Sequence, residues 1–545
     1  MEAMTHSAPL PRNEPVLEYR PDSPERAAIR RALAGLTASA PVHLPMRIEG
    51  ADVEGTGDPF TVTAPHRHSQ VLGHGHTATE AEVGTAIDAA LRARREWGEA
   101  SFESRAAVFL RAADLLAGPW RARVNAATML GQSKTVLQAD IDAAAELVDF
   151  WRFNVHYAAH LDADQPSSPP GSWNRLELRP LEGFVLAITP FNFTSIAGNL
   201  PTAPALMGNT VVWKPATTQQ LAASVLIQVL EAAGLPAGVI NMVTGHSSGV
   251  SAAALPHPHL AGIHFTGSTG TFHHIWSTVS DNLDNYRSYP RLVGETGGKD
   301  FVVAHRSASM DALLVGLLRG AFEYQGQKCS AASRAYVPRA MWEELRGPLA
   351  SATESLAMGD PTDFRNFMGA VIEEKAFRIH EEAITAAHSD PSISLVAGGE
   401  CDSSEGWFVR PTILETPDPH HDLMERELFG PVLTVHPYED DDWETLLRTV
   451  DGTSPYGLTG AVFATDRSAI DSSMRVLRNA AGNFYINDKP TGAVVGQQPF
   501  GGGRASGTND KAGSAFNLLR WASPRAIKET FVPPTDWRYP HQLPD

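Results

Sequence analysis

The chain has 545 residues, 43% of them hydrophobic, and a formal net charge of −18 from 44 basic and 62 acidic side chains. The length predicts two or more domains, and the hydrophobic fraction is that of a globular protein, neither disordered nor membranous. The acidic balance argues against nucleic acid and anionic membranes as partners. Its two cysteines, Cys329 and Cys401, lie too far apart in the sequence to build a disulfide framework, so we expect a reducing compartment, the cytoplasm.

The N-terminal part predicts little regular structure before residue 79. Residues 1–20 mix glutamates with prolines, which is typical of neither a secretory signal nor a transit peptide. We expect an irregular arm over residues 1–60, which are rich in proline, glycine and polar side chains. Thr79 and Glu82 form a capping box that predicts a helix start, and further helices are expected over residues 102–116 and 140–160.

From residue 184 onward, short apolar segments alternate with amphipathic ones. One uncharged stretch, residues 183–213, has the length of a membrane span, but its prolines and asparagines favour a buried strand–loop–helix–strand. The alternation predicts βαβ units on parallel sheets, which bind ligands at the carboxyl ends of their strands. Strands are expected at residues 184–188, 210–213, 239–243, 262–265, 292–294, 301–304, 335–337, 432–435 and 460–465. The glycine-rich residues 482–513 are expected to form irregular functional loops.

Cys329 lies in the stretch Gly-Gln-Lys-Cys-Ser-Ala-Ala that begins at Gly326. A lone cysteine is more often a small buried hydrophobic residue. Polar neighbours, a glycine and small side chains beside the sulfur instead favour a nucleophile that meets a substrate. Cys401 lies in a segment with the composition of a surface loop, and we expect no role for it.

Two further side chains could complete a site around that thiol. Glu295 ends a predicted strand and precedes two glycines, so it is either a plain loop carboxylate or the base that activates a water. Asn192 follows the strand at residues 184–188, where it either satisfies a turn or offers an N–H to a developing oxyanion.

Other segments are expected at the ligand-binding edge of the parallel sheet, although they do not indicate which ligand binds there. The turn 267–270, Gly-Ser-Thr-Gly, opens a helix and resembles a phosphate seat, although it is not the three-glycine dinucleotide fingerprint. Lys214 ends a strand, where it is either a surface lysine or a ligand contact. Four histidines between residues 66 and 76 look like part of a solvated loop, and no carboxylate or cysteine nearby completes a metal site.

Six motifs occur in an order and spacing that resemble the aldehyde dehydrogenase superfamily, over residues 60–530. They are Phe191-Asn192, Trp213-Lys214-Pro215, Phe265-Thr266-Gly267-Ser268, Glu295-Thr296-Gly297-Gly298-Lys299, Gly326-Gln327-Lys328-Cys329 and Glu427-Leu428-Phe429-Gly430-Pro431-Val432. The resemblance implies an α/β fold with a Rossmann-type cofactor domain, an α/β catalytic domain and a small oligomerisation arm. The implied bounds are 1–296 for the NAD-binding domain, with an arm near 160–181 and a returning segment near 497–520, then 297–496 for the catalytic domain and 521–545 for an oligomerisation flap.

Residues 322–334, and residues 482–490 with their continuation 496–509, resemble the members of this family that oxidise L-glutamate γ-semialdehyde, formed from 1-pyrroline-5-carboxylate, in proline breakdown. The resemblance implies that Cys329 attacks the aldehyde, that Asn192 and the Cys329 N–H hold the oxyanion, and that Glu295 activates water. Two alternatives stay open: a dehydrogenase for another small ω-semialdehyde, and a catalytically silent family member. The presence of all three side chains argues against the silent protein.

The resemblance also implies ligand contacts. For NAD they are Lys214 and Glu427 at the riboses, Gly267, Ser268, Thr269, Gly270 and Thr271 at the pyrophosphate, Phe429 near the nicotinamide ribose, and the backbone of Thr189. For the substrate they are Ser330, Gly492 and Ala493 at the carboxylate, Glu146 at the ammonium, and Phe193 and Phe500 along the aliphatic chain. Ala493 stands where serine is usual, and Thr217 where many strictly NAD-dependent relatives have glutamate, so NADP stays open as a cofactor.

The same resemblance implies partners. It predicts a homodimer or higher homo-oligomer that pairs through residues 167–177 and 521–528, and it raises a separate proline dehydrogenase as a partner that supplies the intermediate. No nucleic acid, membrane or metal is expected.

Overall fold

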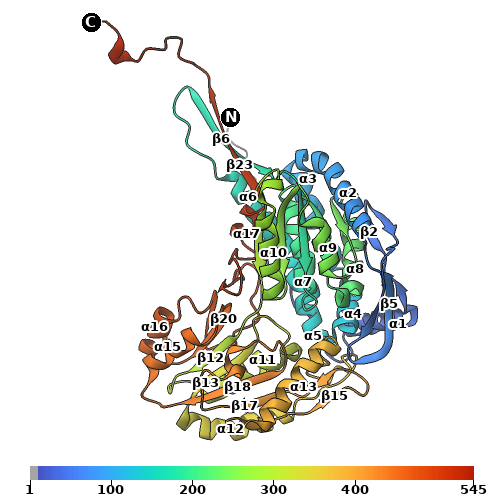
Figure 1. Ribbon diagram of the computed structural model, residues 1–545, viewed down its shortest axis with the longest axis vertical. Coiled ribbons are helices and arrows are strands. Elements are labelled where there is room, and N and C mark those ends of the chain that lie inside the picture. Colours follow the sequence, from blue (N-terminus) through green and yellow to red (C-terminus); the bar gives the residue numbers. More distant parts are fainter. Residues whose placement is uncertain (1–9, 545) are drawn as a thin grey trace.

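The computed structural model describes residues 10–544, and two seven-stranded sheets organise them. The first sheet and its helices occupy the upper part of Figure 1, and the second sheet and its helices occupy the lower part. In order across the first sheet, the strands are β11 (Arg291–Glu295), β10 (Leu260–Thr266), β7 (Phe184–Thr189), β8 (Thr210–Pro215), β9 (Ile240–Met242), β2 (Met46–Ile48) and β3 (Ala51–Val53).

Five strands of the first sheet, β7 to β11, are parallel, and β2 and β3 extend it in antiparallel fashion. Because β8 and β9 follow on one side of β7 whereas β10 and β11 lie on the other, the strand order reverses between β7 and β10. Ligands of such sheets bind at this reversal, beyond the carboxyl ends of the strands. The sheet therefore places the segments after β7 and β10 at one ligand-binding edge.

Helices cover both faces of the first sheet. Alternate residues of β7 point to opposite faces, so Phe184, Leu186 and Ile188 join one buried cluster while Val185 and Ala187 join another. The first cluster includes α2 (Glu80–Glu99), α9 (Ser247–Ala254) and α10 (Thr269–Asp281). The second includes α3 (Phe102–Ala117), α4 (Arg121–Gln132), α6 (Leu147–Ala163), α7 (Thr194–Leu206) and α8 (Gln220–Ala232).

Several predicted elements of this layer are confirmed. The capping box of Thr79 and Glu82 starts α2. The uncharged stretch forms β7, α7 and β8. Every residue of the two strands is buried, and so are nearly all residues of the helix. Within residues 10–544, no helix is long and apolar enough to cross a membrane. The helix expected over residues 140–160 begins as a π-helix, η1 (Asp140–Glu146), before it continues as α6.

The second sheet is built in the same way and carries one antiparallel edge strand, β14. In order, its strands are β14 (Ser394–Ala397), β17 (Thr412–Glu415), β18 (Val432–Tyr438), β13 (Ala332–Pro338), β12 (Asp300–Ala304), β20 (Thr459–Phe463) and β21 (Asn483–Ile486). Its helices are α11 (Met310–Phe322), α12 (Arg339–Glu354), α13 (Glu374–Ser389), α14 (Asp422–Glu425), α15 (Trp443–Thr453) and α16 (Arg467–Val476). The irregular segment expected from residue 482 is wrong at its start, because β21 pairs there with β20.

The irregular arm predicted for residues 1–60 is wrong in its described part, which forms α1 (Pro24–Ser39) and four short strands. Within α1 only Ile29 and Leu33 are buried, so its apolar periodicity is too weak to read from the sequence. Besides β2 and β3, the strands are β1 (Val42–His43) and β4 (Pro59–Ala64), which belong to a small sheet with β5 (Arg67–His76). Residues 1–9 lie outside the described part.

The histidine segment is likewise no solvated loop. Three of the four histidines lie on β5, and His66, just before it, is buried. Among residues 10–544, no group of three or more His, Cys, Asp or Glu side chains could hold a metal ion.

A two-stranded ribbon projects from the body of the molecule (Figure 1). It pairs β6 (Ser172–Pro180) with β23 (Ala522–Thr530) in antiparallel register from Pro180↔Ala522 to Ser172↔Thr530. Short elements complete the chain: α5 (Val136–Ala139), α17 (Ala515–Leu519), the pair β15 (Cys401–Asp402) with β16 (Phe408–Val409), and the pair β19 (Tyr456–Gly457) with β22 (Gly503–Arg504).

Candidate active site

The loop before Cys329 has an unusual backbone. In the 3-10 turn η4 (Glu323–Gly326), Tyr324 and Gln325 have φ angles of 53° and 55°, and Gly326 has 65°. Non-glycine residues adopt this left-handed region at a cost, so other contacts must hold the loop. The Gln325 amide does so, because it donates to the carbonyl oxygens of Ser133 at 3.1 Å and Ala370 at 2.7 Å.

Glycine is needed at position 326 because another backbone passes closely. A Cβ on Gly326 would lie 2.4 Å from the Gly430 carbonyl oxygen. The approaching group is the segment that leads into β18.

The Cys329 thiol is buried, with 8% of its surface exposed, and it forms no disulfide. Burial, and then the neighbouring Glu295 carboxylate, raise the pKa of the thiol well above its usual value. The thiol is therefore neutral in this state and needs a base before it can attack. Its backbone N–H finds no oxygen acceptor within residues 10–544, so it is available to a ligand.

Asn192 lies beside the nucleophile loop. Its buried side-chain amide donates one N–H to the Gln327 carbonyl oxygen at 3.0 Å, two residues before Cys329. An amide carries two N–H groups, so the second remains for another acceptor. This arrangement brings Asn192 to the Cys329 backbone, as an oxyanion site requires.

Glu295 is the last residue of β11 and lines the same cleft as Cys329. Burial raises the pKa of its carboxyl to about 7, while nearby Lys511 lowers it. One of its carboxylate oxygens, Oε1, is buried and has no hydrogen-bond partner in the described chain. A buried carboxylate with an unused oxygen and a pKa near neutrality suits a general base.

One cleft brings the predicted substrate residues together with the nucleophile. It holds about 1110 Å³ of empty space, part of it open to solvent, and Cys329 and Glu295 line its wall. All six predicted substrate residues also line it: Glu146, Phe193, Ser330, Gly492, Ala493 and Phe500. Most of the wall is apolar, as in small-molecule sites with few convergent polar groups.

A short loop at one end of the cleft offers free backbone donors. The Ser330 hydroxyl lies 2.8 Å from the Thr491 hydroxyl, which fixes the start of the loop next to Cys329. Gly492 has a φ of 91°, which favours glycine. The N–H groups of Gly492 and Ala493 find no acceptor among residues 10–544, and successive unpaired N–H groups bind anions.

A buried carboxyl lies at another part of the cleft. Glu146 ends the π-helix η1, and burial raises the pKa of its carboxyl to about 8, with a further contribution from Asp142. The Ser195 hydroxyl donates to it at 3.1 Å. Lys134 does not neutralise it directly, because its ammonium pairs with Asp142 at 2.5 Å and lies over the Phe193 ring. A cationic group in the cleft would find Glu146 as its counterion.

The predicted cofactor residues of the first sheet meet at its carboxyl edge. Thr189 ends β7, Lys214 lies in β8 in register with Ile188, and Gly267 follows β10. Ser268 caps α10, so the turn 267–270 does open a helix. A Cβ on Gly270 would meet nothing within 4 Å, which leaves the helix N-terminus open, as an anionic ligand requires.

Two of these residues already carry internal contacts. The Thr189 hydroxyl accepts the Trp213 indole N–H at 3.1 Å, and its carbonyl oxygen accepts the Ala216 N–H at 3.1 Å. Burial lowers the pKa of the Lys214 ammonium to about 8. The side chains of Thr189 and Lys214 are both buried at this edge of the sheet.

Glu427 and Phe429 reach this edge from the second sheet. The Glu427 carboxylate accepts the Gly298 N–H at 2.8 Å, and burial raises its pKa to about 7. A Cβ on Gly297 would lie 2.1 Å from Glu427 Oε2, which explains the first of the two glycines after Glu295. Phe429 packs edge-on against Phe191, with ring centroids 5.9 Å apart.

The donor set of this edge fits a dinucleotide. An open helix N-terminus suits a pyrophosphate, and a carboxylate suits ribose hydroxyls. The helix N-terminus follows β10 at the reversal of strand order in the first sheet, and the Glu427 carboxylate lies at Gly298, three residues after β11.

Comparisons with known proteins agree with this geometry. A model of the aldehyde dehydrogenase family matches residues 53–525. The chain belongs to the aldehyde dehydrogenase family. The predicted fold class and the prediction of an enzyme, an oxidoreductase, are thereby confirmed.

Individual relatives of this aldehyde dehydrogenase cover nearly its whole length. The Mus musculus protein named delta-1-pyrroline-5-carboxylate dehydrogenase, mitochondrial, is 50% identical over 528 residues, which cover 97% of this chain and 94% of that protein. The solved delta-pyrroline-5-carboxylate dehydrogenase from Mycobacterium tuberculosis bound with NAD is 57% identical, with a TM-score of 0.96 and 100% of both chains covered. The 1-pyrroline-5-carboxylate dehydrogenase from Thermus with bound NAD is 30% identical, with a TM-score of 0.90, and covers 96% of this chain and 100% of its own.

Two residues of this aldehyde dehydrogenase site escaped the sequence analysis. Lys511 contacts the carbonyl oxygens of Gly482 and Gly501, both at 2.8 Å, and its charge acts on Glu295. Thr491 holds Ser330. Each is an ordinary polar residue in a glycine-rich segment, and neither has a spacing that signals a role.

Proposed function

We propose that this aldehyde dehydrogenase oxidises L-glutamate γ-semialdehyde, the open form of 1-pyrroline-5-carboxylate, to L-glutamate, with NAD as the hydride acceptor. The observation that supports this substrate most strongly is the set of groups in the cleft. It combines a cysteine nucleophile and an unpaired carboxylate with two open N–H groups for an anion and a buried carboxyl for a cation. An aldehyde that carries both an α-carboxylate and an α-ammonium matches that set. The near-full-length relatives named for this activity support the same substrate.

The first step uses the chain's own acid–base groups. The ionised Glu295 carboxylate, directly or through a water, takes the Cys329 proton, and the sulfur then bonds to the aldehyde carbon. The carbonyl oxygen becomes an oxyanion held by the Cys329 N–H and the second amide N–H of Asn192. Loss of one such donor raises the barrier by about 3 kcal/mol.

The second half releases the acid. The chemistry that bound NAD supplies is acceptance of the hydride from the carbon that carries the sulfur, which leaves a thioester on Cys329. Glu295 first releases the Cys329 proton to solvent and then deprotonates a water, the hydroxide bonds to the thioester carbon, and the C–S bond breaks. The carboxylic acid formed gives its proton to the Cys329 thiolate, so the products are the carboxylate and the neutral thiol, and the proton on Glu295 leaves to solvent.

The cleft orients the substrate through its amino-acid end. Gly492 and Ala493 donate their backbone N–H groups to the α-carboxylate, with the Ser330 hydroxyl beside them. Glu146 receives the α-ammonium, and its raised pKa would fall back as that charge arrives. Phe193 and Phe500 cover the methylene groups between. The alanine at position 493 keeps the backbone donor and gives up only a side-chain hydroxyl.

For the cofactor we propose Lys214 and Glu427 at the two riboses, residues 267–271 at the pyrophosphate, Phe429 near the nicotinamide ribose, and a contact from the Thr189 backbone. Thr217 has no carboxylate to repel a 2′-phosphate, and its hydroxyl donates to the Gly245 carbonyl oxygen at 3.4 Å. NAD is the proposed cofactor, and the KM ratio of NADP to NAD measures the preference.

We further propose the domain bounds 1–296 for the NAD-binding domain, with an arm near 160–181 and a returning segment near 497–520, then 297–496 for the catalytic domain and 521–545 for the oligomerisation flap.

The exposed Phe531, Val532, Trp537 and Tyr539 near the β6–β23 ribbon support pairing of two copies there. Light scattering tests this, and a monomer would contradict it. Pull-down with a proline dehydrogenase tests the proposed supplier of the intermediate.

Location in the cell stays a prediction. Cys329 and Cys401 are both free thiols, which suits the cytoplasm, whereas the mouse relative is named mitochondrial. Fractionation of the source cells decides between a cytoplasmic and an organellar enzyme.

A substrate panel tests the proposed activity. NADH absorbance is followed with 1-pyrroline-5-carboxylate, succinic semialdehyde and butanal. The proposal predicts the highest kcat/KM for the first, and no turnover after Cys329→Ala. A higher kcat/KM for another ω-semialdehyde would replace the substrate, and no NADH with any aldehyde would indicate a silent family member.

A further inference from the structure

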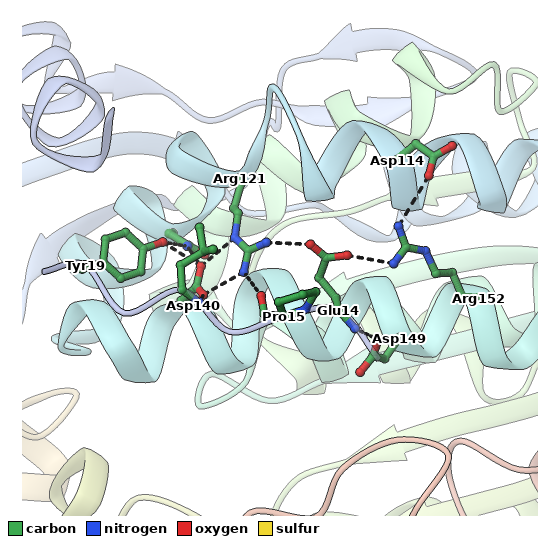
Figure 2. Close-up of polar contacts among 10 residues, drawn as sticks. Glu14, Pro15, Tyr19, Asp114, Arg121, Asp140, Asp149 and Arg152 are labelled. Atoms are coloured by element: carbon green, nitrogen blue, oxygen red, sulfur yellow. Dashed lines mark hydrogen bonds and ion pairs between the residues drawn. The ribbon is translucent and has the colours of Figure 1, made fainter. Parts of the chain in front are cut away.

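The N-terminal segment, defined here as residues 10–20, lies along the helices behind the cleft although it has no regular secondary structure. Figure 2 shows how its charged and polar groups are held. The Glu14 carboxylate pairs with Arg121 and Arg152, each at 2.8 Å. The Tyr19 hydroxyl donates to Asp140 on η1 at 2.7 Å. These contacts fix the segment against α4, η1 and α6.

Asn13 of this segment makes contacts of a different kind, because one amide joins two parts of the substrate site. Its Nδ2 donates to the Asp149 carboxylate on α6 at 2.7 Å and to the Val495 carbonyl oxygen at 2.8 Å. Its Oδ1 accepts from Gln497 Nε2 at 3.1 Å. The Glu14 backbone N–H also donates to Asp149, at 2.7 Å, which secures the segment on the α6 side.

Val495 closes the loop that offers the open backbone donors. Thr491 is tied to Ser330 at the start of this loop, and Val495 is tied to Asn13 two residues after Ala493. Inside the loop, the Val494 N–H donates to the Gln498 side chain at 2.9 Å. The donors of Gly492 and Ala493 therefore lie between two external tethers, one beside the nucleophile and one from the N-terminal segment.

Asp149 lies one helical turn after Glu146 on the continuous helix η1–α6. Asn13 therefore connects the loop proposed for the substrate carboxylate with the helix that carries the proposed partner of its ammonium. The distance between these two groups decides whether an α-amino acid end fits both at once. Misplacement of such anchors weakens binding without removing any reacting group.

We propose that Asn13 is a positioning residue that sets the spacing between the Gly492–Ala493 loop and Glu146, and thereby the affinity for the α-amino acid end of the substrate. The inference rests on the proposed function. Asn13 touches neither the reacting atoms nor the cofactor edge. It acts on KM for substrates that carry both charged groups and leaves the chemistry at Cys329 unchanged.

The test compares two aldehydes in three variants of the full chain. Asn13→Ala is expected to raise KM for glutamate γ-semialdehyde about fivefold, the effect of about one lost hydrogen bond, with kcat nearly unchanged. The KM values for NAD and for butanal, which has neither charged group, are expected to stay as in wild type. Tyr19→Phe is the matched control, because it loses a buried contact of the same segment far from the loop, so only its thermal stability should fall.

Gln497→Ala is a second variant that tests the inference even if Asn13→Ala fails to fold. This surface change removes only the bond to Asn13 Oδ1, and KM for the semialdehyde is expected to rise about twofold. Equal KM changes for both aldehydes in either variant, an unchanged semialdehyde KM, or the same KM change in Tyr19→Phe would overturn the inference. If wild type itself shows no preference for the semialdehyde over butanal, the proposed function fails instead, whatever the variants show.

Discussion

The hydroxyls of Ser330 and Thr491 lie 2.8 Å apart, so the residue after the nucleophile holds the start of the loop that lies beside it in the cleft. Ser330 belongs to the loop before β13, and Thr491 follows β21, 161 residues later in the sequence. This one contact links the reactive thiol with the loop that carries Gly492 and Ala493. Through Ser330, the position of the loop proposed to bind the substrate carboxylate depends on the position of the nucleophile loop.

Thr491→Val removes that contact while it keeps the shape of the side chain. We expect kcat/KM for the semialdehyde to fall about fivefold, mainly through KM, because one hydrogen bond contributes about 1 kcal/mol. Steady-state kinetics with the aldehyde and with NAD varied in turn measure this. Thr465→Val, which removes a hydroxyl contact on an exposed loop, is the control. A rise in KM for NAD alone would show that Thr491 acts elsewhere.

The pH dependence of turnover follows from Glu295. Its carboxyl has a pKa of about 7 and must be ionised to act as a base, so activity is expected to rise with pH through that value. Lys511 lowers the pKa of Glu295, so Lys511→Met should move the midpoint of the profile upward. The profile of kcat between pH 5.5 and about 9 measures both. A midpoint that stays in place or moves downward in the variant would remove Lys511 from this role.

The same burial carries a stability cost. Because the pKa of Glu295 is raised above its unfolded value, the folded state binds its proton more tightly, and stability falls as pH rises between the usual carboxyl pKa of 4.5 and about 7. Glu295→Gln removes that cost, on the order of 3 kcal/mol above pH 7. Thermal unfolding at pH 5 and pH 8 should therefore show the variant gaining on wild type at the higher pH. A gain confined to the lower pH would contradict the sign.

Glu427→Gln and Lys214→Met test the cofactor edge. Both change charged groups that lie at the carboxyl edge between the two sheets, outside the substrate cleft. We expect KM for NAD to rise about tenfold or more in each, as for the loss of a hydrogen bond to a charged group, whereas KM for the aldehyde changes little. Equal changes in both KM values would place these residues in the fold and not in the cofactor site.

The motifs of the catalytic centre were readable because each carries its chemistry in a short stretch. Cys329 among small residues, Glu295 before two glycines and Asn192 after a buried strand predicted three groups that the structure brings to one region. The buried strands were also readable, since residues such as those of β7 are apolar on both faces.

The parts that the sequence did not predict depend on contacts between distant segments. Asn13 and Thr491 act through hydrogen bonds to residues distant in the sequence, among them Val495, 482 positions from Asn13, and Ser330, 161 positions from Thr491, and no local pattern encodes such pairs. The first three strands, β1, β2 and β3, have only two or three residues each, too few to show an alternation. The proline and glycine residues around these strands indicated turns, so an irregular arm was predicted in their place.

The central claim is that Cys329 forms a thioester with the semialdehyde that Glu295 then hydrolyses. It is tested by mass spectrometry of Glu295→Gln mixed with NAD and 1-pyrroline-5-carboxylate at high pH, then quenched in acid. An acyl group of γ-glutamyl mass on the peptide that contains Cys329, formed with one NADH per site and then no further turnover, is the predicted result. Wild-type turnover without any adduct, or an adduct on another residue, would contradict the account.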